Sequence, residues 1–279
     1  MPYSAEISRS NPTCFLFLID QSSSMTGPFS GQPGKKKAEG VADAINRLLQ
    51  NLALKCAKSD GIRDYFHVAV LGYGEQVQSA LGGNLAGQLL FPISAIANNP
   101  LRVEQRTRKV DDGAGGLVEQ SFKFPVWFEP TAGGKTPMCA ALTGAREVLH
   151  DFIGRFPGSY PPLVINITDG HATDGNPEPP AEAVRSLTTA DGNVLLFNAH
   201  LSSSPAPPVV FPNREADLAD AHARSLFRMS SPLPQRLREA AQSEGHAVEE
   251  QARGFVFNAD LVAVIRFLDI GTRAAHNLR

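Results

Sequence analysis

Four short, mainly apolar runs restrict how this chain can fold more than any other feature. They cover residues 14–19, 66–72, 163–168 and 193–201. Runs of this length, apolar at consecutive positions, are typical of strands that are covered on both faces of a parallel sheet. A membrane-spanning helix needs about 20 apolar residues, so no membrane span is predicted. The runs indicate the strands of a buried central sheet.

Segments with helical periodicity separate these runs. Apolar residues recur at intervals of three and four over residues 41–56 and 138–153, which predicts two amphipathic helices. Thr136 and Pro137 suit the N-cap and the first position of the second helix. We also expect a short edge strand at residues 75–80, and helices at residues 181–187, 215–228, 234–244 and 260–270, the last with an apolar centre that a strand would also suit.

Strands that alternate with helices predict an α/β fold, a doubly wound, mostly parallel central sheet flanked by helices. We expect a single domain over residues 13–271, with an N-terminal tail at residues 1–12 and a C-terminal tail at residues 272–279. Residues 82–134 interrupt the alternation before the second major helix. We interpret them as an insertion outside the sheet core, hairpin-like, with a helix in its first half.

The composition excludes several classes of protein. The 26 Lys and Arg against 28 Asp and Glu give a net charge of −2, which predicts neither a nucleic-acid partner nor an acidic disordered chain. The three cysteines are widely spaced and form no C-x-x-C, so neither a disulfide framework nor a zinc site is expected. No signal-peptide pattern is recognisable at the start. We therefore expect a cytoplasmic protein without a membrane partner.

Carboxylates and hydroxyls follow the predicted strands. Asp20, Ser22 and Ser24 come after the first run, Asp169 follows the third, and Thr136 opens the second helix. Loops after parallel strands share one edge of the sheet, so these side chains should converge there. Oxygen ligands with two carboxylates suit a hard cation, Mg²⁺ or Mn²⁺, although Ca²⁺ stays open.

Three motifs at these positions resemble those of the von Willebrand factor A (VWA) family. They are the D-x-S-x-S of residues 20–24, the threonine of Gly133-Gly-Lys-Thr136, and the T-D-G of residues 168–170. In that family such residues form the metal-ion-dependent adhesion site (MIDAS). The resemblance, which covers residues 13–271, implies that an ion is held there and that a partner Asp or Glu completes its coordination. The span before Thr136 is longer than a minimal VWA domain needs.

A second likeness concerns residues 220–231 and 253–260. These segments resemble the intracellular bacterial VWA proteins of the tellurium-resistance type. The likeness implies a component of a stress, signalling or conflict system, acting with a protein phosphatase or kinase that is encoded nearby.

Each candidate residue also has a purely structural interpretation. Ser22 and Ser24 could satisfy backbone groups in a turn, and Thr136 could act only as a helix cap. Gln21, His171 and Asp174 are candidates for contacts with a partner, although such residues are more often part of a solvated loop. The three lysines at residues 35–37 are expected to be a solvated loop edge.

The leading hypothesis is a metal-dependent protein-binding module without catalytic activity. The alternative is a metal-assisted phosphohydrolase with Asp20 as nucleophile. Haloacid-dehalogenase-like enzymes place a second aspartate two residues later, where this chain has Ser22, and neither a G-x-S-x-G elbow nor a complete Walker loop occurs. An exported adhesion subunit is a third hypothesis, and the lack of a signal-peptide pattern counts against it.

Overall fold

The computed structural model describes residues 2–29, 32–111, 116–202, 207–218 and 220–271. The C-terminal tail expected at residues 272–279 lies outside the described residues.

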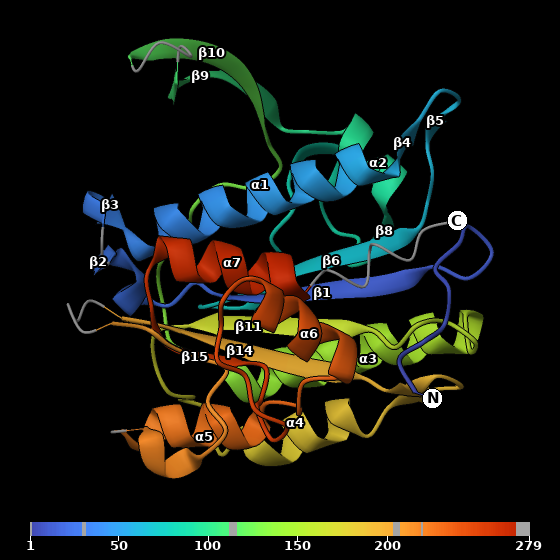
Figure 1. Cartoon of the computed structure of the whole chain (residues 1–279), viewed down its shortest axis with the longest axis vertical. Helices are drawn as coiled ribbons and strands as arrows, with labels where there is room; N and C mark the ends of the chain where they lie inside the picture. Colours follow the sequence, from blue (N-terminus) through green and yellow to red (C-terminus); the bar gives the residue numbers. More distant parts are fainter. Residues whose placement is uncertain (1, 30–31, 112–115, 203–206, 219, 272–279) are drawn as a thin grey trace.

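A mostly parallel sheet of eight strands, counted over the described residues, forms the centre of the molecule (Figure 1). Its strand order is β15-β16-β14-β11-β1-β6-β7, and β8 also pairs with β6. The four apolar runs form four neighbouring parallel strands of it, which confirms the doubly wound α/β class. They are β1 (Thr13–Asp20), β6 (Phe66–Tyr73), β11 (Leu163–Thr168) and β14 (Leu195–Leu201). The other four are β7 (Val77–Ser79), β8 (Phe91–Pro92), β15 (Val209–Val210) and β16 (Phe255–Ala259).

Helices cover both faces of the sheet and explain why the central strands are apolar throughout (Figure 1). Alternate side chains of β1 point to opposite faces. Phe15 and Phe17 therefore belong to one buried cluster, whereas Leu16 and Leu18 belong to the other. The first face carries α1 (Lys37–Cys56), α2 (Ile93–Asn98), α6 (Gln235–Ser243) and α7 (Leu261–Gly271). The second carries α3 (Met138–Arg155), α4 (Glu178–Arg185) and α5 (Ala221–Met229).

Short elements lie at the margins of the sheet. Three 3₁₀ turns are η1 (Ser23–Thr26), η2 (Gly83–Leu85) and η3 (Glu215–Asp217). Small two-stranded ribbons pair β2 (Pro28–Phe29) with β3 (Gln32–Lys36), β4 (Ala57–Lys58) with β5 (Gly61–Ile62), and β12 (Thr188–Thr189) with β13 (Gly192–Asn193).

Two helix boundaries differ from the prediction. The second major helix, α3, begins at Met138, and Pro137 rather than Thr136 stands at its N-cap. The single helix expected at residues 215–228 is divided into η3 and α5. Asp220 causes the division, because its carboxylate accepts hydrogen bonds from the first backbone N–H groups of α5 and so starts a new helix.

The insertion is only partly an accessory element. The hairpin of β9 (Arg102–Asp111) and β10 (Leu117–Val126) stands away from the sheet above α1 (Figure 1). Its flanks belong to the main core. We expected all of residues 82–134 to lie outside the sheet core, and for the flanks this expectation is wrong. Leu85, Ile96 and Trp127 are buried there, and the Trp127 indole N–H donates to the Ile96 carbonyl at 2.6 Å.

The described part of the expected N-terminal tail, residues 2–12, packs against the domain. Ile7 is completely buried in the core, and the Tyr3 N–H donates to the carbonyl of Asp191 at 2.8 Å. No helix among the described residues combines the length and apolar character needed to cross a bilayer.

Candidate metal centre

The topology of the sheet brings two aspartates to the same edge. From β1 the chain passes to β6 on one side and later to β11 on the other, so the direction of winding changes at the β1–β11 pair. Crevices at such a switch point are the usual ligand sites of doubly wound sheets. Asp20 is the last residue of β1, and Asp169 comes directly after β11.

Hydrogen bonds join the loops that follow these two strands. The Ser22 and Ser24 hydroxyl oxygens lie 2.9 Å apart, and the Ser24 hydroxyl donates to Asp169 Oδ1 at 2.6 Å. The Ser22 N–H donates to Asp20 Oδ1 at 2.8 Å. The four residues therefore form one continuous chain of oxygen-bearing groups, as their positions after the strands predict.

Asp20 is deeply enclosed at the start of this chain. It is 1% exposed, and its second oxygen, Oδ2, accepts a hydrogen bond from the Thr168 hydroxyl at 2.6 Å. Burial raises the pKa of the Asp20 carboxyl, and the neighbouring charge of Asp169 adds to this, while hydrogen bonds from Ser22 and Thr168 oppose it. A nearby cation would relieve the cost of keeping this carboxylate ionised.

A glycine turn carries Thr136 to the same edge. The Gly133 N–H donates to the Gln21 carbonyl at 2.6 Å, which ties the turn to the loop after β1. Gly134 has φ +76°, and a Cβ there would lie 2.6 Å from the backbone nitrogen of Glu75. Only glycine suits both the left-handed backbone and the close approach. The Thr136 N–H in turn donates to the Thr173 hydroxyl at 3.0 Å.

The hydroxyl of Thr136 has no capping role. The carboxylate of Asp174 performs that role for α3, since it accepts from the N–H groups of Cys139 at 3.1 Å and Ala140 at 2.9 Å. No hydrogen bond joins the Thr136 hydroxyl to any other described residue. Thr136 is 6% exposed. Its oxygen thus remains available to a ligand at this edge.

Lys37 was expected to be solvated, and the structure corrects this. Its Nζ lies 2.9 Å from Asp169 Oδ2, and the two side chains are 10% and 1% exposed. Lys37 is the first residue of α1, and the Lys37 N–H donates to the Gly27 carbonyl at 3.0 Å, which fixes the start of the helix beside the site. The lysine therefore balances one of the two carboxylate charges from within the chain.

The candidate ligands fit a hard cation, provided that the ion displaces the Lys37 ammonium from Asp169. The candidate ligands are oxygens throughout, and two carboxylates match the charge of a divalent ion. Within the described residues no group of three or more His, Cys, Asp and Glu side chains is placed to hold a metal. An ion at this edge would therefore depend on the hydroxyls as well as on the aspartates, and it would compete with Lys37 for Asp169.

The candidate partner contacts surround this edge. The Gln21 side chain lies over Gly72, where a Cβ would come within 2.1 Å of its Oε1. The exposed His171 ring stacks on His222, with ring centroids 4.3 Å apart and an interplanar angle of 9°. Asp174 is occupied by the start of α3, as described above. Contacts of these residues with a partner stay a prediction.

A buried polar ladder that was not predicted from the sequence lies beneath the site. The Tyr73 hydroxyl donates to Asn166 Oδ1 at 2.7 Å, Asn166 Nδ2 donates to Asn198 Oδ1 at 2.9 Å, and Asn198 Nδ2 donates to the Ser230 hydroxyl at 2.9 Å. Asn166 and Asn198 are direct neighbours on β11 and β14. The available signal was an asparagine at the centre of each of two apolar runs, since a buried amide needs a partner.

Comparisons with known proteins give distant likenesses. No protein-family model and no curated protein matches the chain. Similar solved structures include the vWF domain of the type V pili tip protein Mfa5 from Porphyromonas gingivalis, with 14% identity over 58% of this chain and 39% of that chain, at a TM-score of 0.33. Another is the pilus adhesin RrgA from Streptococcus pneumoniae, with 17% identity over 59% of this chain and 21% of that chain, at a TM-score of 0.30. The match thus spans well under half the length of either protein, and likeness at this level assigns no activity or partner.

Proposed function

We propose that the chain is a metal-dependent protein-binding module. One divalent ion, Mg²⁺ or Mn²⁺, would be held at the carboxyl edge of the sheet by Asp20, Ser22, Ser24, Thr136 and Asp169. The observation that supports this most is the hydrogen-bonded chain of Asp20, Ser22, Ser24 and Asp169 across two loops. A bound ion would supply an electrophilic centre to which a carboxylate from a partner protein can add.

The partner would present an exposed Asp or Glu, because a carboxylate adds charge attraction to coordination and a neutral amide does not. We extend the proposal to a cytoplasmic, bacterial stress, signalling or conflict-system component that acts with a phosphatase or kinase. This part rests on the resemblance of residues 220–231 and 253–260 to proteins of the tellurium-resistance type.

We propose no catalytic role for Asp20. Both of its carboxylate oxygens accept hydrogen bonds, from the Ser22 N–H and the Thr168 hydroxyl, and the residue is 1% exposed. Each oxygen keeps a lone pair that an ion could use, but a nucleophile must also be reached by the phosphorus atom of a substrate, so the burial of Asp20 weighs against a phosphohydrolase. A phosphatase assay with a generic phosphomonoester, run with Mg²⁺ and with EDTA, tests the point, and metal-dependent turnover lost in Asp20→Asn would favour the enzyme.

The metal site is tested by calorimetric titration of Mn²⁺ and Mg²⁺ into protein stripped with EDTA. We expect one ion per chain in the wild type and none in Asp169→Ala. Partner capture is then compared in Mg²⁺ and in EDTA for the wild type and Thr136→Ala. Binding that is equal in EDTA would mean that the interface lies elsewhere.

A further inference from the structure

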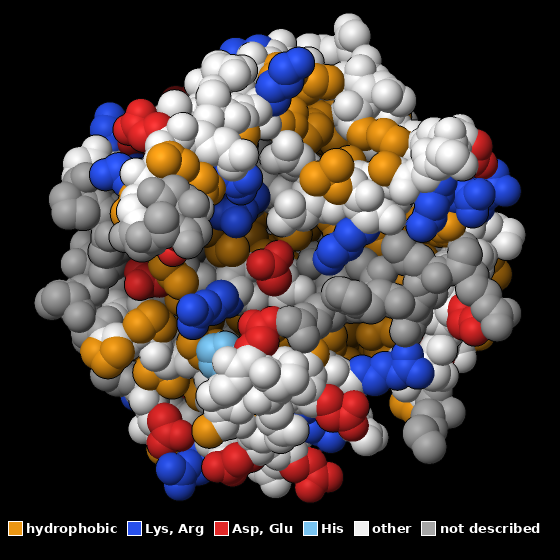
Figure 2. All heavy atoms as spheres, turned by 45° about the horizontal axis from the view of Figure 1, so that its top comes forward, with side chains coloured by type: hydrophobic (Ala, Val, Ile, Leu, Met, Phe, Trp, Pro, Cys, Tyr) orange, Lys and Arg blue, Asp and Glu red, His pale blue; other side chains and the backbone are white. Residues whose placement is uncertain are grey.

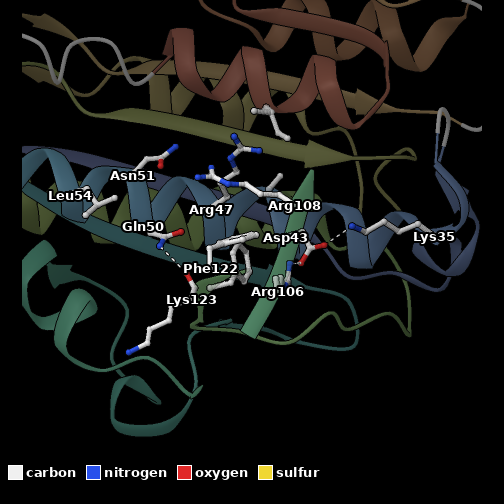
Figure 3. Close-up of a pocket in the computed structure, with 13 residues that line it drawn as sticks. Lys35, Asp43, Arg47, Gln50, Asn51, Leu54, Arg106, Arg108, Phe122 and Lys123 are labelled. Carbon is white, nitrogen blue, oxygen red and sulfur yellow. Dashed lines mark hydrogen bonds and ion pairs between the residues drawn. The ribbon is translucent and has the colours of Figure 1, made fainter. Parts of the chain in front are cut away.

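A cleft between α1 and the β9–β10 hairpin has no part in the proposed function. It has a volume of about 520 Å³, and α7 contributes Ile265 to its wall. The lining combines apolar side chains with five basic residues and one acidic residue (Figure 3). The basic residues are Lys35, Arg47, Arg106, Arg108 and Lys123, and the acidic residue is Asp43.

Part of this positive charge is balanced inside the cleft. Asp43 forms ion pairs with both Lys35 and Arg106 (Figure 3). Arg106 also pairs with Glu104. The guanidinium of Arg106 lies 3.7 Å from the centre of the Phe124 ring. These contacts build a fixed wall where the hairpin meets α1.

The rest of the positive charge forms no close ion pair among the described residues, although Arg47 lies near enough to Asp269 to oppose the rise that burial causes in the pKa of that carboxyl. No ion pair joins Arg47, Arg108 or Lys123 to an acidic side chain in the part of the chain that the structure describes. Among the described residues, Arg108 hydrogen-bonds to the neutral Gln120 amide oxygen, at 3.0 and 2.8 Å. Figure 3 draws the guanidinium groups of Arg47 and Arg108 near one another, while Lys123 extends away from them. Two like charges that line one cleft favour an anion between them.

The apolar lining indicates what kind of anion fits. Leu54 is 65% exposed, and the half-buried Phe122 and Ile265 lie in the same lining. Arg106 lies over the Phe124 ring and Arg108 lies 5.6 Å from the centre of the Phe122 ring, so an arginine already stands on one side of each ring, which leaves less flat surface for a base. Nucleic-acid bases need such faces for stacking. Basic and acidic side chains are also interspersed over the face drawn in Figure 2, rather than forming a broad basic track.

We infer that this cleft binds an acidic, extended segment of a partner protein, with its carboxylates on Arg47 and Arg108 and an apolar side chain against Leu54 and Phe122. The site is separate from the carboxyl edge and needs no metal. Because the arginines are exposed, each carboxylate contact is screened by salt. Affinity should therefore be modest and strongly dependent on ionic strength.

The test uses a fluorescein-labelled peptide of about ten residues, long enough in extended form to pass through the cleft, that is rich in glutamate and contains two leucines. Fluorescence anisotropy measures its binding to the full chain in EDTA, which excludes the metal site. We expect binding that weakens about tenfold or more in the double variant Arg47→Gln/Arg108→Gln. A peptide with glutamine in place of glutamate should bind the wild type at least as weakly as the glutamate peptide binds the double variant.

Arg146→Gln is the matched control, since Arg146 is exposed on α3 and lies on the opposite face of the sheet. Arg146→Gln changes the net charge by half as much as the double variant does. Arg146→Glu changes the net charge by the same amount as the double variant. Neither should change peptide affinity more than about twofold. Equal losses in the cleft and control variants would mean only general charge attraction and would overturn the inference. Binding of a single-stranded oligonucleotide in preference to the peptide would overturn it as well. Failure in EDTA leaves the metal proposal untouched, because that proposal is read from ion titration.

Discussion

The carboxyl edge of the sheet and the cleft beside the hairpin carry opposite excess charges in opposite environments. At the edge, Asp20 and Asp169 meet the single ammonium of Lys37, and the Asp169 and Lys37 side chains are 1% and 10% exposed. In the cleft, five basic side chains meet one aspartate, and Lys35, Asp43 and Arg106 are 26%, 30% and 32% exposed. Charge interactions are several times stronger where water is excluded. Single charge-removing substitutions should therefore have large energetic effects at the edge and small ones in the cleft.

Helix α1 belongs to both regions. Its first residue, Lys37, reaches the edge, and Asp43 and Arg47 farther along the helix line the cleft. The run of lysines at residues 35–37 is therefore divided between the two regions, because Lys35 pairs with Asp43 and Lys37 pairs with Asp169.

The largest effect is expected for Lys37→Met. Removing the ammonium leaves Asp169 buried without its counterion, which costs about 3 kcal/mol in the protein without metal. The same change raises the negative charge that an ion meets, so affinity for Mn²⁺ should rise about tenfold or more. Thermal melting in EDTA and calorimetric titration measure the two effects.

Lys36→Met is the matched control for this variant, because Lys36 is exposed and forms no ion pair with a described residue. It should change neither quantity beyond about 0.5 kcal/mol. Unchanged ion affinity in Lys37→Met, with the protein folded, would show that an ion at this edge does not compete with the lysine.

Asp20→Ala should remove the stabilisation by metal. An ion at about 100 times its dissociation constant adds about 2.7 kcal/mol to the stability of the wild type. The variant lacks one of the two carboxylates and should melt at the same temperature with Mg²⁺ and with EDTA. Differential scanning calorimetry measures both. An equal rise in the two proteins would place the ion elsewhere in the chain.

Much of the fold could be predicted from local sequence patterns. The apolar runs identified the four central parallel strands, because strands covered on both faces must be apolar throughout. The strand β16, between β14 and β15, was missed, since it has only five residues and includes Asn258, which has a positive φ of 57°. The extent of the insertion was also misjudged, because the burial of Trp127 depends on contacts with α1 and α2 that no local pattern encodes.

The sequence predicted the part of the candidate site that the sheet topology brings together. It did not predict the part that depends on a contact with a side chain far away in the sequence. Strand ends on one edge of a parallel sheet explain why Asp20, Ser22, Ser24 and Asp169 meet. Lys37 lies 132 positions from Asp169 in the sequence, so nothing near it indicated an ion pair. The role of these residues as metal ligands stays a prediction.

In the protein without metal, Asp20→Asn is expected to have a smaller effect, and this effect is an increase in stability. Folding raises the pKa of this carboxyl through burial, so the folded protein holds its proton more tightly than the unfolded chain does. Its contribution to stability is therefore complete in acid and falls as pH rises through the folded-state pKa. An amide avoids that loss and can still bond to the Ser22 N–H and the Thr168 hydroxyl.

The variant should match the wild type near pH 4 and exceed it at neutral pH by about 1 kcal/mol, or roughly 2–4 °C in melting temperature. Thermal melts in EDTA across this pH range measure the difference. A variant that is less stable than the wild type at neutral pH would mean that the ionised carboxylate is stabilising even without an ion.

The smallest effect on stability is expected when the hairpin is shortened. Residues 103–122 would be replaced by a short Gly/Ser linker, while the buried Phe124, Val126 and Trp127 are kept. The strands β9 and β10 pair with each other and with no other strand among the described residues, and Val103, Leu117 and Val118 are 54%, 69% and 47% exposed. The Arg106–Asp43 pair is lost, but a pair this exposed contributes less than about 1 kcal/mol. The shortened protein should keep its response to Mg²⁺ and lose affinity for the acidic peptide, which separates the two regions experimentally.

Replacing residues 85–98 by the same linker is the contrasting control and should prevent folding, because Leu85, Ile93 and Ile96 are in the core. If the shortened hairpin variant also lost its metal response, the edge and the cleft would be coupled through α1 rather than independent.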